Sequence, residues 1–189
     1  LARHFPQALN PGFPALQLGE VAWASGDLST AARWFDEADA LLPNDRGELT
    51  RAILHTNRAE LALARGDVTA ARRELQAAIP HVQIHVRRLR YWLVTLAGFL
   101  LADGAPLRAP VAALACLAAE HGLGRHGGPL SPMYQALLVE RLADARTQTV
   151  PAEGVACWQA SQQWTAAQTL AYGRSLLLAD VVTDPFAQP

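Results

Sequence analysis

The sequence predicts an all-α fold, an α-α superhelix in which antiparallel helical hairpins stack in series. The first observation behind this prediction is an internal repeat: Gly-Asp-Leu-Ser-Thr-Ala-Ala at residues 26–32 returns as Gly-Asp-Val-Thr-Ala-Ala-Arg at residues 66–72. A weaker copy begins at Gly104. The second observation is that apolar residues around these segments recur at spacings of three and four, the period of a helix. Self-similarity at a period of about 40 residues is typical of stacked helical hairpins.

The recurring segment has the chemistry of a tight turn between two helices. Gly26 and Gly66 can adopt the left-handed backbone conformation that ends a helix. We expect Ser29 and Thr69 to cap the following helix, because a hydroxyl oxygen there can accept a hydrogen bond from a backbone N–H of the first turn. Each repeat is therefore predicted to be one αα-hairpin.

The predicted hairpins follow one another along the chain. The helices of the first are expected at residues 15–25 and 28–42, those of the second at 48–65 and 69–79, and those of the third at 86–102 and 109–120. In the first of these helices Leu18, Val21, Ala22 and Trp23 form the apolar set. Pro43 and Pro80 are expected to end the helices that precede them.

The last third of the chain departs from the repeat. Residues 122–129 contain four glycines and predict a loop. Further helices are expected at 132–147, 152–162 and 165–179, with Thr165 capping the last. The chain is therefore divided into a lead-in at 1–12, three hairpins at 13–121, a loop with packed helices at 122–182, and a frayed tail at 183–189.

Composition narrows the possible functions. The 189 residues are 51% apolar, enough for a buried core, and no apolar stretch approaches the roughly 18 residues of a membrane span. The net charge of −1 gives no general attraction to nucleic acid or anionic lipid. All 16 basic residues are Arg, which excludes a P-loop lysine or a Schiff-base lysine. Cys116 and Cys157 lack metal-ligand spacing and predict reduced thiols, so we expect a cytoplasmic protein.

The first repeat carries particular residue types at fixed positions: Leu18-Gly19, Ala31, Phe35, Ala38 and Pro43. This pattern resembles the tetratricopeptide repeat (TPR). It departs from that repeat at Ala15 and Ala22, where large aromatic residues are usual. The second and third copies are more degenerate, and they keep Asn57, Ala59, Gly66, Ala71, Leu75 and Ala78, and then Leu96, Ala97, Gly104 and Ala109.

The C-terminal residues carry a narrower resemblance. Residues 155–161 and 164–172, with Trp158 and Trp164, are similar to the end of the repeat region in large bacterial signalling-ATPase or LuxR-type transcriptional regulators. The chain departs from that ending at Ser161, where Gly is usual, and at Gln168, where Glu is common. The chain begins without Met, and the resemblance implies that it is a piece of such a regulator.

The TPR resemblance implies a concave groove that is lined mainly by the first helix of each hairpin and that binds protein or peptide. The predicted groove residues are Gln17, Glu20, Trp23, Thr56, Asn57, Glu60, Arg90, Tyr91 and Thr95. Asn57 stands where peptide-binding members hold the ligand backbone, but the paired basic residues that clamp a C-terminal carboxylate are absent. We predict a non-catalytic protein-protein interaction scaffold, self-association included, that needs neither cofactor nor metal.

Two alternative functions remain open from the sequence. The chain could be the ligand-sensing arm of an ATPase-linked transcriptional regulator, with a small inducer in the concave groove. It could also bind nucleic acid through the basic residues Arg87 to Arg90, which stand next to Tyr91 and Trp92. Helical spacing places Leu89, Trp92, Leu93 and Leu96 in the core and the arginines at its edges, so we expect a solvated or ion-paired face there, and nucleic acid is the less favoured partner for this chain.

The histidines offer weaker signals. His81 and His85 lie one helical turn apart, a spacing that suits two metal ligands, but no Cys or carboxylate is near them in the sequence. His121 and His126 flank the glycine-rich loop. We expect these histidines to be solvated, and we assign no metal site and no catalytic residue.

Overall fold

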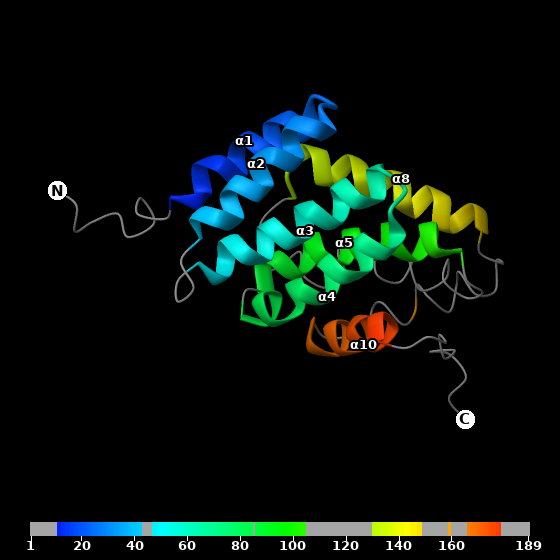
Figure 1. The fold of residues 1–189 in the computed structure, drawn as a ribbon. Helices are drawn as coiled ribbons and strands as arrows, with labels where there is room; N and C mark the ends of the chain where they lie inside the picture. Colours follow the sequence, from blue (N-terminus) through cyan, green and yellow to red (C-terminus); the bar gives the residue numbers. More distant parts are fainter. Residues whose placement is uncertain are drawn as a thin grey trace.

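The computed structural model describes residues 11–42, 47–84, 86–104, 130–148, 159 and 166–178. Their regular structure is entirely helical, which confirms the predicted all-α class (Figure 1). The helices are α1 (Gly12–Ala24), α2 (Leu28–Leu41), α3 (Glu48–Ala64), α4 (Val68–Ile84), α5 (Val86–Asp103), α8 (Pro132–Gln148) and α10 (Ala166–Leu178).

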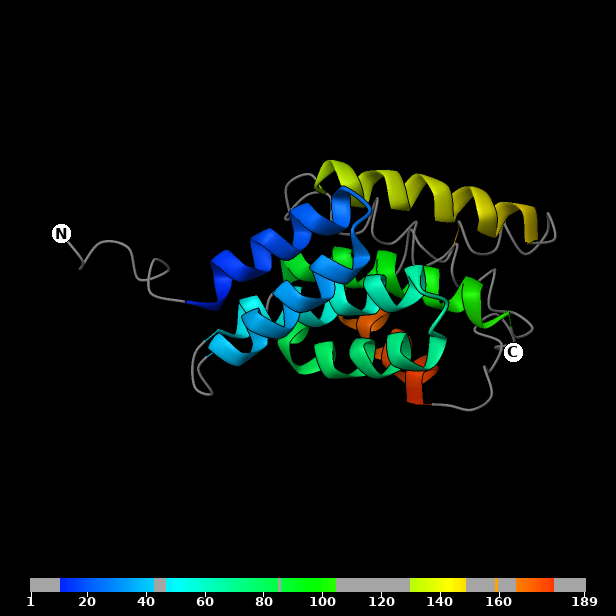
Figure 2. The same cartoon turned by 45° about the horizontal axis from the view of Figure 1, so that its top comes forward.

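The helices form hairpins that stack in series, as the predicted superhelix requires. Helices α1 and α2 pack against each other, as do α3 and α4. Helix α3 also contacts both α1 and α5, so the first helices of successive hairpins form one continuous layer (Figures 1 and 2). None of the described helices is long and apolar enough to cross a membrane.

The two complete hairpins share one turn geometry. Gly26 and Gly66 have φ angles of 84° and 73°, in the left-handed region that favours glycine. The next residue caps the following helix: Thr30 N–H donates to Asp27 Oδ1 at 3.0 Å, and Asp67 accepts from Ala70 N–H in the same way.

The prediction that Ser29 and Thr69 are the caps is therefore wrong. Helices α2 and α4 begin at Leu28 and Val68, one residue after each aspartate, so Ser29 and Thr69 already lie inside the first turn. From the position before the helix, the aspartate carboxylate reaches the N–H three residues on. Ser29 Oγ instead donates to Asp27 Oδ1 at 2.9 Å.

The core is built from two buried clusters. In the first hairpin, Phe35 of α2 packs onto α1 at Gly19, where a Cβ would lie 2.4 Å from the ring. In the second, the predicted core residues Leu89, Trp92, Leu93 and Leu96 of α5 are all buried. The indole N–H of Trp92 donates to the carbonyl oxygen of Leu75 at 3.0 Å, so its polar atom is satisfied inside the core.

Helix α4 continues through Pro80, so the prediction that Pro80 ends a helix is wrong. A proline inside a helix removes one backbone hydrogen bond and crowds the carbonyl four residues earlier. Pro80 lies on the exposed side of α4, whereas its neighbours Ile79 and Val82 are buried. Packing of this apolar face stabilises the turn that proline weakens.

The buried face of α1 also differs from the prediction. Ala15, Leu16, Gly19 and Ala22 are buried, whereas Leu18 and Val21 keep 46% and 68% of their surface exposed. Gly19 has no room for a larger side chain, because the Phe35 ring of α2 fills the space beside it.

The two C-terminal helices pack on different sides of the stack. Helix α8 contacts α5 and lies beside α1, while α10 contacts α4 and α5 (Figure 2). The carbonyl oxygen of Leu177, near the end of α10, accepts hydrogen bonds from Arg72 Nε and Gln76 Nε2 of α4 at 2.9 and 2.8 Å. These bonds satisfy a carbonyl that the last turn of a helix leaves without an intrahelical partner.

Several predictions lie outside the described residues. They are the helices at 109–120 and, apart from Gln159, at 152–162; the loop at 122–129; the cap at Thr165; the tail at 183–189; and Cys116, Cys157, His85, His121 and His126.

Candidate partner-binding groove

The nine predicted groove residues come from the inner layer of the stack. Gln17, Glu20 and Trp23 lie on α1, Thr56, Asn57 and Glu60 on α3, and Arg90, Tyr91 and Thr95 on α5. Helix α3 contacts both α1 and α5, and seven of the nine residues line one of two cavities described below. Part of this inner layer is covered by α8, and Thr56, Asn57, Glu60, Arg90 and Thr95 are buried.

A buried ion pair joins α8 to the array. Arg141 of α8 donates from Nη1 to Glu60 Oε1 at 2.6 Å and from Nη2 to Glu60 Oε2 at 2.5 Å, so the pair is bidentate. Nη1 also donates to the carbonyl oxygen of Val94 at 2.7 Å, and Thr95 Oγ1 donates to Glu60 Oε1 at 2.7 Å. The Glu60 side chain is 2% exposed and that of Arg141 9%, so water screens this attraction little.

Helix α5 leaves room for the guanidinium at Gly98. A Cβ at this position would stand 2.5 Å from Cζ of Arg141 and 2.6 Å from its Nε. Any larger side chain therefore requires Arg141 to move.

Tyr134 forms the second attachment of α8. Its hydroxyl donates to Asn57 Oδ1 at 3.1 Å, while Asn57 Nδ2 donates to Glu20 Oε1 at 2.9 Å, which links α8, α3 and α1. The Tyr134 ring meets Trp23 and Tyr91 edge-on, with centroids 5.9 and 4.7 Å away. Burial raises the pKa of Tyr134 well above its usual value, and the negative charge of Glu60 adds to this effect, so the hydroxyl stays protonated and can donate.

Space remains on both sides of α8. A cavity of about 480 Å³ lies between α1, α3, α5 and the start of α8, and the predicted groove residues that line it are Gln17, Glu20, Thr56, Asn57 and Tyr91. A second cavity, of about 470 Å³, lies farther along α8, and it is lined by Trp23 and Glu60 among others. Arg90 and Thr95 line neither of these two cavities.

Comparison with known proteins supports the repeat assignment. The chain is 41% identical over 76 residues to the human protein "Tetratricopeptide repeat protein 36", and this match covers 40% of the chain. The matched part of the chain is therefore similar in sequence to a TPR protein. The match spans 37% of the length of that relative. No protein-family profile matches the chain, and no solved structure matches it.

The arginines of α4 and α5 serve the helical array in different ways. Arg90 is 8% exposed, so it is buried and does not stand at the edge of the core as predicted. Arg88 lies over the ring of Tyr91, 5.1 Å from its centroid. Arg72 binds the end of α10, and the side chain of Arg87 lies outside the described residues. The described arginines therefore do not form one continuous basic face.

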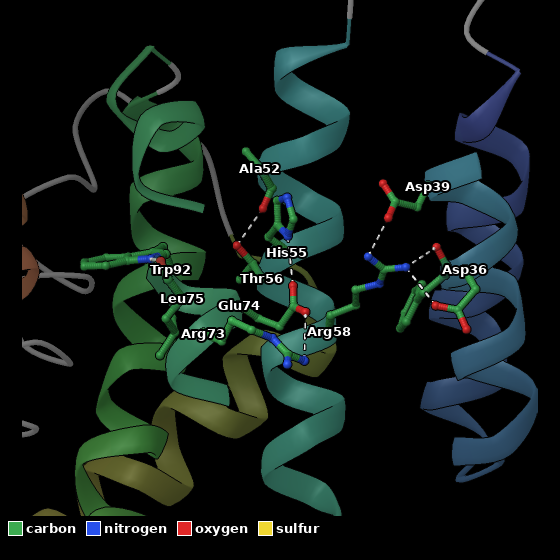
Figure 3. A network of polar contacts seen from close by, with 11 residues as sticks. Asp36, Asp39, Ala52, His55, Thr56, Arg58, Arg73, Glu74, Leu75 and Trp92 are labelled. Atoms are coloured by element: carbon green, nitrogen blue, oxygen red, sulfur yellow. Dashed lines mark hydrogen bonds and ion pairs between the residues drawn. The ribbon is translucent and has the colours of Figure 1, made fainter. Parts of the chain in front are cut away.

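On the other side of α3, a polar network links neighbouring helical hairpins (Figure 3). Arg58 donates from Nη1 to Asp39 Oδ2 and from Nη2 to Asp36 Oδ1, both at 2.8 Å, and so connects α3 to α2. His55 Nδ1 lies 2.8 Å from Glu74 Oε2 of α4. This network holds the hairpins in register beside the groove.

His81 differs from its prediction as a solvated residue. Its side chain is 16% exposed, and its Nδ1 pairs with Glu48. Its ring stacks on His55 with a centroid distance of 5.8 Å. The interface between α3 and α4 thus encloses the histidine.

The sequence-based site omitted the residues that α8 contributes, chiefly Tyr134 and Arg141. A signal for them was present, because Tyr134, Leu138, Arg141 and Ala145 follow the helical period and share one face of α8. An arginine on such a face needs a buried anion, and Glu60, on the predicted inner face of α3, is a suitable partner.

Proposed function

We propose that this chain is a non-catalytic protein-interaction scaffold that binds a segment of another protein on the concave side of its TPR-like array. The observation that carries the proposal is the cavity of about 480 Å³ between α1, α3, α5 and α8, here named the entry cavity. It opens where the first helices of successive hairpins meet, and five of the nine predicted groove residues line it.

The walls of the entry cavity suit an apolar side chain with polar neighbours. Phe13 and Val21 of α1 are 42% and 68% exposed beside it, and Ile53 and Met133 add further apolar surface. Glu20 is held in place at the rim, because its two oxygens accept from Gln17 Nε2 at 2.8 Å and from Asn57 Nδ2. Arg88 supplies a positive charge at the same cavity. An apolar anchor flanked by charges is the pattern that interface hot spots favour.

The test uses two exposed valines with matched exposure. Val21 lines the entry cavity and is 68% exposed, whereas Val139 on α8 is 62% exposed and does not line it. A displayed peptide library is selected against the unaltered chain, and the selected peptides are titrated by fluorescence anisotropy against Val21→Arg and Val139→Arg. We expect Val21→Arg to weaken binding at least about tenfold, because a long charged side chain replaces an apolar one in the wall of the cavity, and Val139→Arg to leave it unchanged.

Two results would overturn the proposal. One is that no peptide binds saturably to the unaltered chain. The other is that both valine variants bind the selected peptides equally, which would place binding elsewhere.

A second candidate is a ligand-sensing arm that takes a small inducer in the same cavity, as part of a bacterial regulator. Its support is the cavity volume, which falls in the range of about 300–1,000 Å³ found for small-molecule sites, together with the C-terminal sequence resemblance. Saturable binding of a small molecule that Val21→Arg abolishes, with no peptide selected, would favour this candidate. The cytoplasmic location and the regulatory context stay predictions.

A further inference from the structure

Helix α8 presents a narrow stripe to the groove. Of its 17 residues, Tyr134, Leu138, Arg141 and Ala145 are described as buried, whereas ten of the 17 residues of α3 are buried. Other residues of α8, such as Gln135, Arg146 and Thr147, are exposed and polar or charged. Met133, Leu137 and Leu142 add partly buried apolar contacts, so the four buried residues form the centre of the attachment.

The groove binds both polar members of this stripe specifically. Asn57 accepts from the Tyr134 hydroxyl, and Glu60 accepts from both terminal nitrogens of Arg141. The two anchors are seven residues apart on α8, which is about 10 Å along a helix. Between them Leu138 is 2% exposed, and beyond them Ala145 is fully buried. A ligand that satisfied the same groove atoms would need the same spacing.

We propose that the groove recognises an amphipathic helix with an aromatic hydroxyl at position i, an aliphatic residue at i+4, arginine at i+7 and a small residue at i+11, and that a partner helix with this stripe replaces α8. The proposal rests on the proposed function, since it takes the concave side as the binding surface. It goes further in naming the partner's chemistry and in treating α8 as the ligand that the chain itself supplies. Tyr134 and Asn57 also line the entry cavity, so the two regions adjoin each other.

The energetics of the Glu60–Arg141 pair favour recognition over permanent attachment. A buried ion pair gives little net stability, because both charges lose their hydration, but it penalises strongly any partner that lacks one of the charges. A helix with only four buried residues among the 17 can also open locally without unfolding of the rest of the molecule. Exchange of α8 for a helix with the same stripe restores the partners of Asn57 and Glu60, whereas simple opening leaves the Glu60 carboxylate without this arginine.

The experiment uses a fluorescent peptide with the sequence of residues 130–148 and the full chain. In the unaltered chain α8 competes with the peptide, so the apparent affinity is reduced by the fraction of open groove. The variant Arg141→Ala weakens the internal helix only, and we expect it to bind the peptide at least about tenfold more tightly than the unaltered chain does. The same peptide with Arg141→Ala should bind this variant at least about tenfold more weakly. A peptide with Arg146→Ala, a change on the exposed side of the helix, should bind as the original does.

Displacement is measured separately by hydrogen exchange. Addition of the peptide to the Arg141→Ala chain should raise exchange in residues 132–148 and leave α3 and α4 unchanged. If circular dichroism shows that Arg141→Ala does not fold, Leu138→Ala serves as the weakened chain, with the same two peptides.

The proposal is overturned if a folded variant binds neither peptide, or binds the two equally. It is also overturned if the chain forms a dimer that depends on Arg141, because the occupant is then α8 of a second copy. The test with Val21 and Val139 uses other peptides and addresses the entry cavity. Failure of the helix-recognition proposal can therefore be distinguished from failure of the proposed scaffold function.

Discussion

Helix α3 carries polar networks of opposite character on its two sides. Arg58 and His55 face α2 and α4, whereas Glu60 and Asn57 face α8. Arg58 and Glu60 are two residues apart, so in a helix of 3.6 residues per turn they lie on nearly opposite sides. The outer network keeps access to water, because Asp36 and Asp39 are 76% and 40% exposed. The inner network is shielded from water, because the side chains of Glu60 and Arg141 are only 2% and 9% exposed.

This difference indicates what each network does. If Arg58 leaves, water can solvate the exposed carboxylates of Asp36 and Asp39. The outer network therefore contributes little to stability, and its role is to adjust the register of hairpins that apolar packing already holds together. Burial lowers the pKa of Arg58, but the carboxylates of Asp39, Glu74 and Asp36 outweigh it, so the pKa is raised and the charge is kept. Water cannot replace a lost partner in the buried inner network, so the loss of that network should reduce stability more.

The largest effect is expected for Glu60→Ala. Removal of one member of a buried ion pair costs about 3–5 kcal/mol, because the remaining charge has lost its hydration. Urea denaturation should show this loss, and Glu140→Ala, an exposed carboxylate of α8, should change stability by less than about 0.5 kcal/mol. The double variant Glu60→Met, Arg141→Met should recover most of the loss, since an apolar pair needs no hydration. A double variant as unstable as Glu60→Ala would contradict this account of the inner network.

The next largest effect is expected for Gly98→Ala. Whether this change lowers or raises stability should depend on the presence of Arg141. In the unaltered chain Gly98→Ala places a Cβ against the guanidinium and should cost about 1–3 kcal/mol. In the Arg141→Ala background the clash is gone, and alanine favours a helix over glycine by about 1 kcal/mol, so the same change should stabilise. Thermal melts of the four chains measure this coupling. Equal costs in both backgrounds would show that Arg141 does not occupy the space beside Gly98.

Arg58→Ala tests the outer network and should cost less. Its guanidinium donates to two exposed aspartates, and solvent screening limits such pairs to about 1 kcal/mol. The loss should shrink further in high salt, unlike that of Glu60→Ala. Arg33→Ala, at an exposed arginine of α2, provides the control. A cost for Arg58→Ala equal to that of Glu60→Ala would remove the distinction between the two sides of α3.

The hairpins could be predicted from the sequence because their determinants are local. Gly26 and Gly66 end helices within the same segment that begins the next, and core residues such as Phe35 and Trp92 follow a short period. The helical period of α8 marks Arg141 as a residue of a buried face, but it does not identify Glu60 as the partner, because the two residues are 81 positions apart and no periodicity relates them. Pro80 shows the opposite failure, since a strong local signal was overridden by the packing of Ile79 and Val82.

The smallest expected effect concerns the Asp27 cap, a charge that belongs to neither network and has no buried partner. Hydrogen bonds from the backbone and side chain of Thr30, and from Ser29, lower the pKa of Asp27 to about 2. Because the folded pKa lies below the unfolded value near 3.9, the cap stabilises the fold above about pH 4, and this contribution is lost as the pH falls from about 4 to 2.

The melting temperature of Asp27→Ala should therefore lie below that of the unaltered chain at neutral pH, with the gap narrowing in acid. Glu37→Ala, at an exposed carboxylate of the same helix, should show no comparable gap. Ser29→Ala should have a smaller effect than Asp27→Ala, because Ser29 only donates to the carboxylate that caps α2. If Ser29→Ala proved the more damaging change, the hydroxyl would be the true cap and the sequence-based prediction would stand.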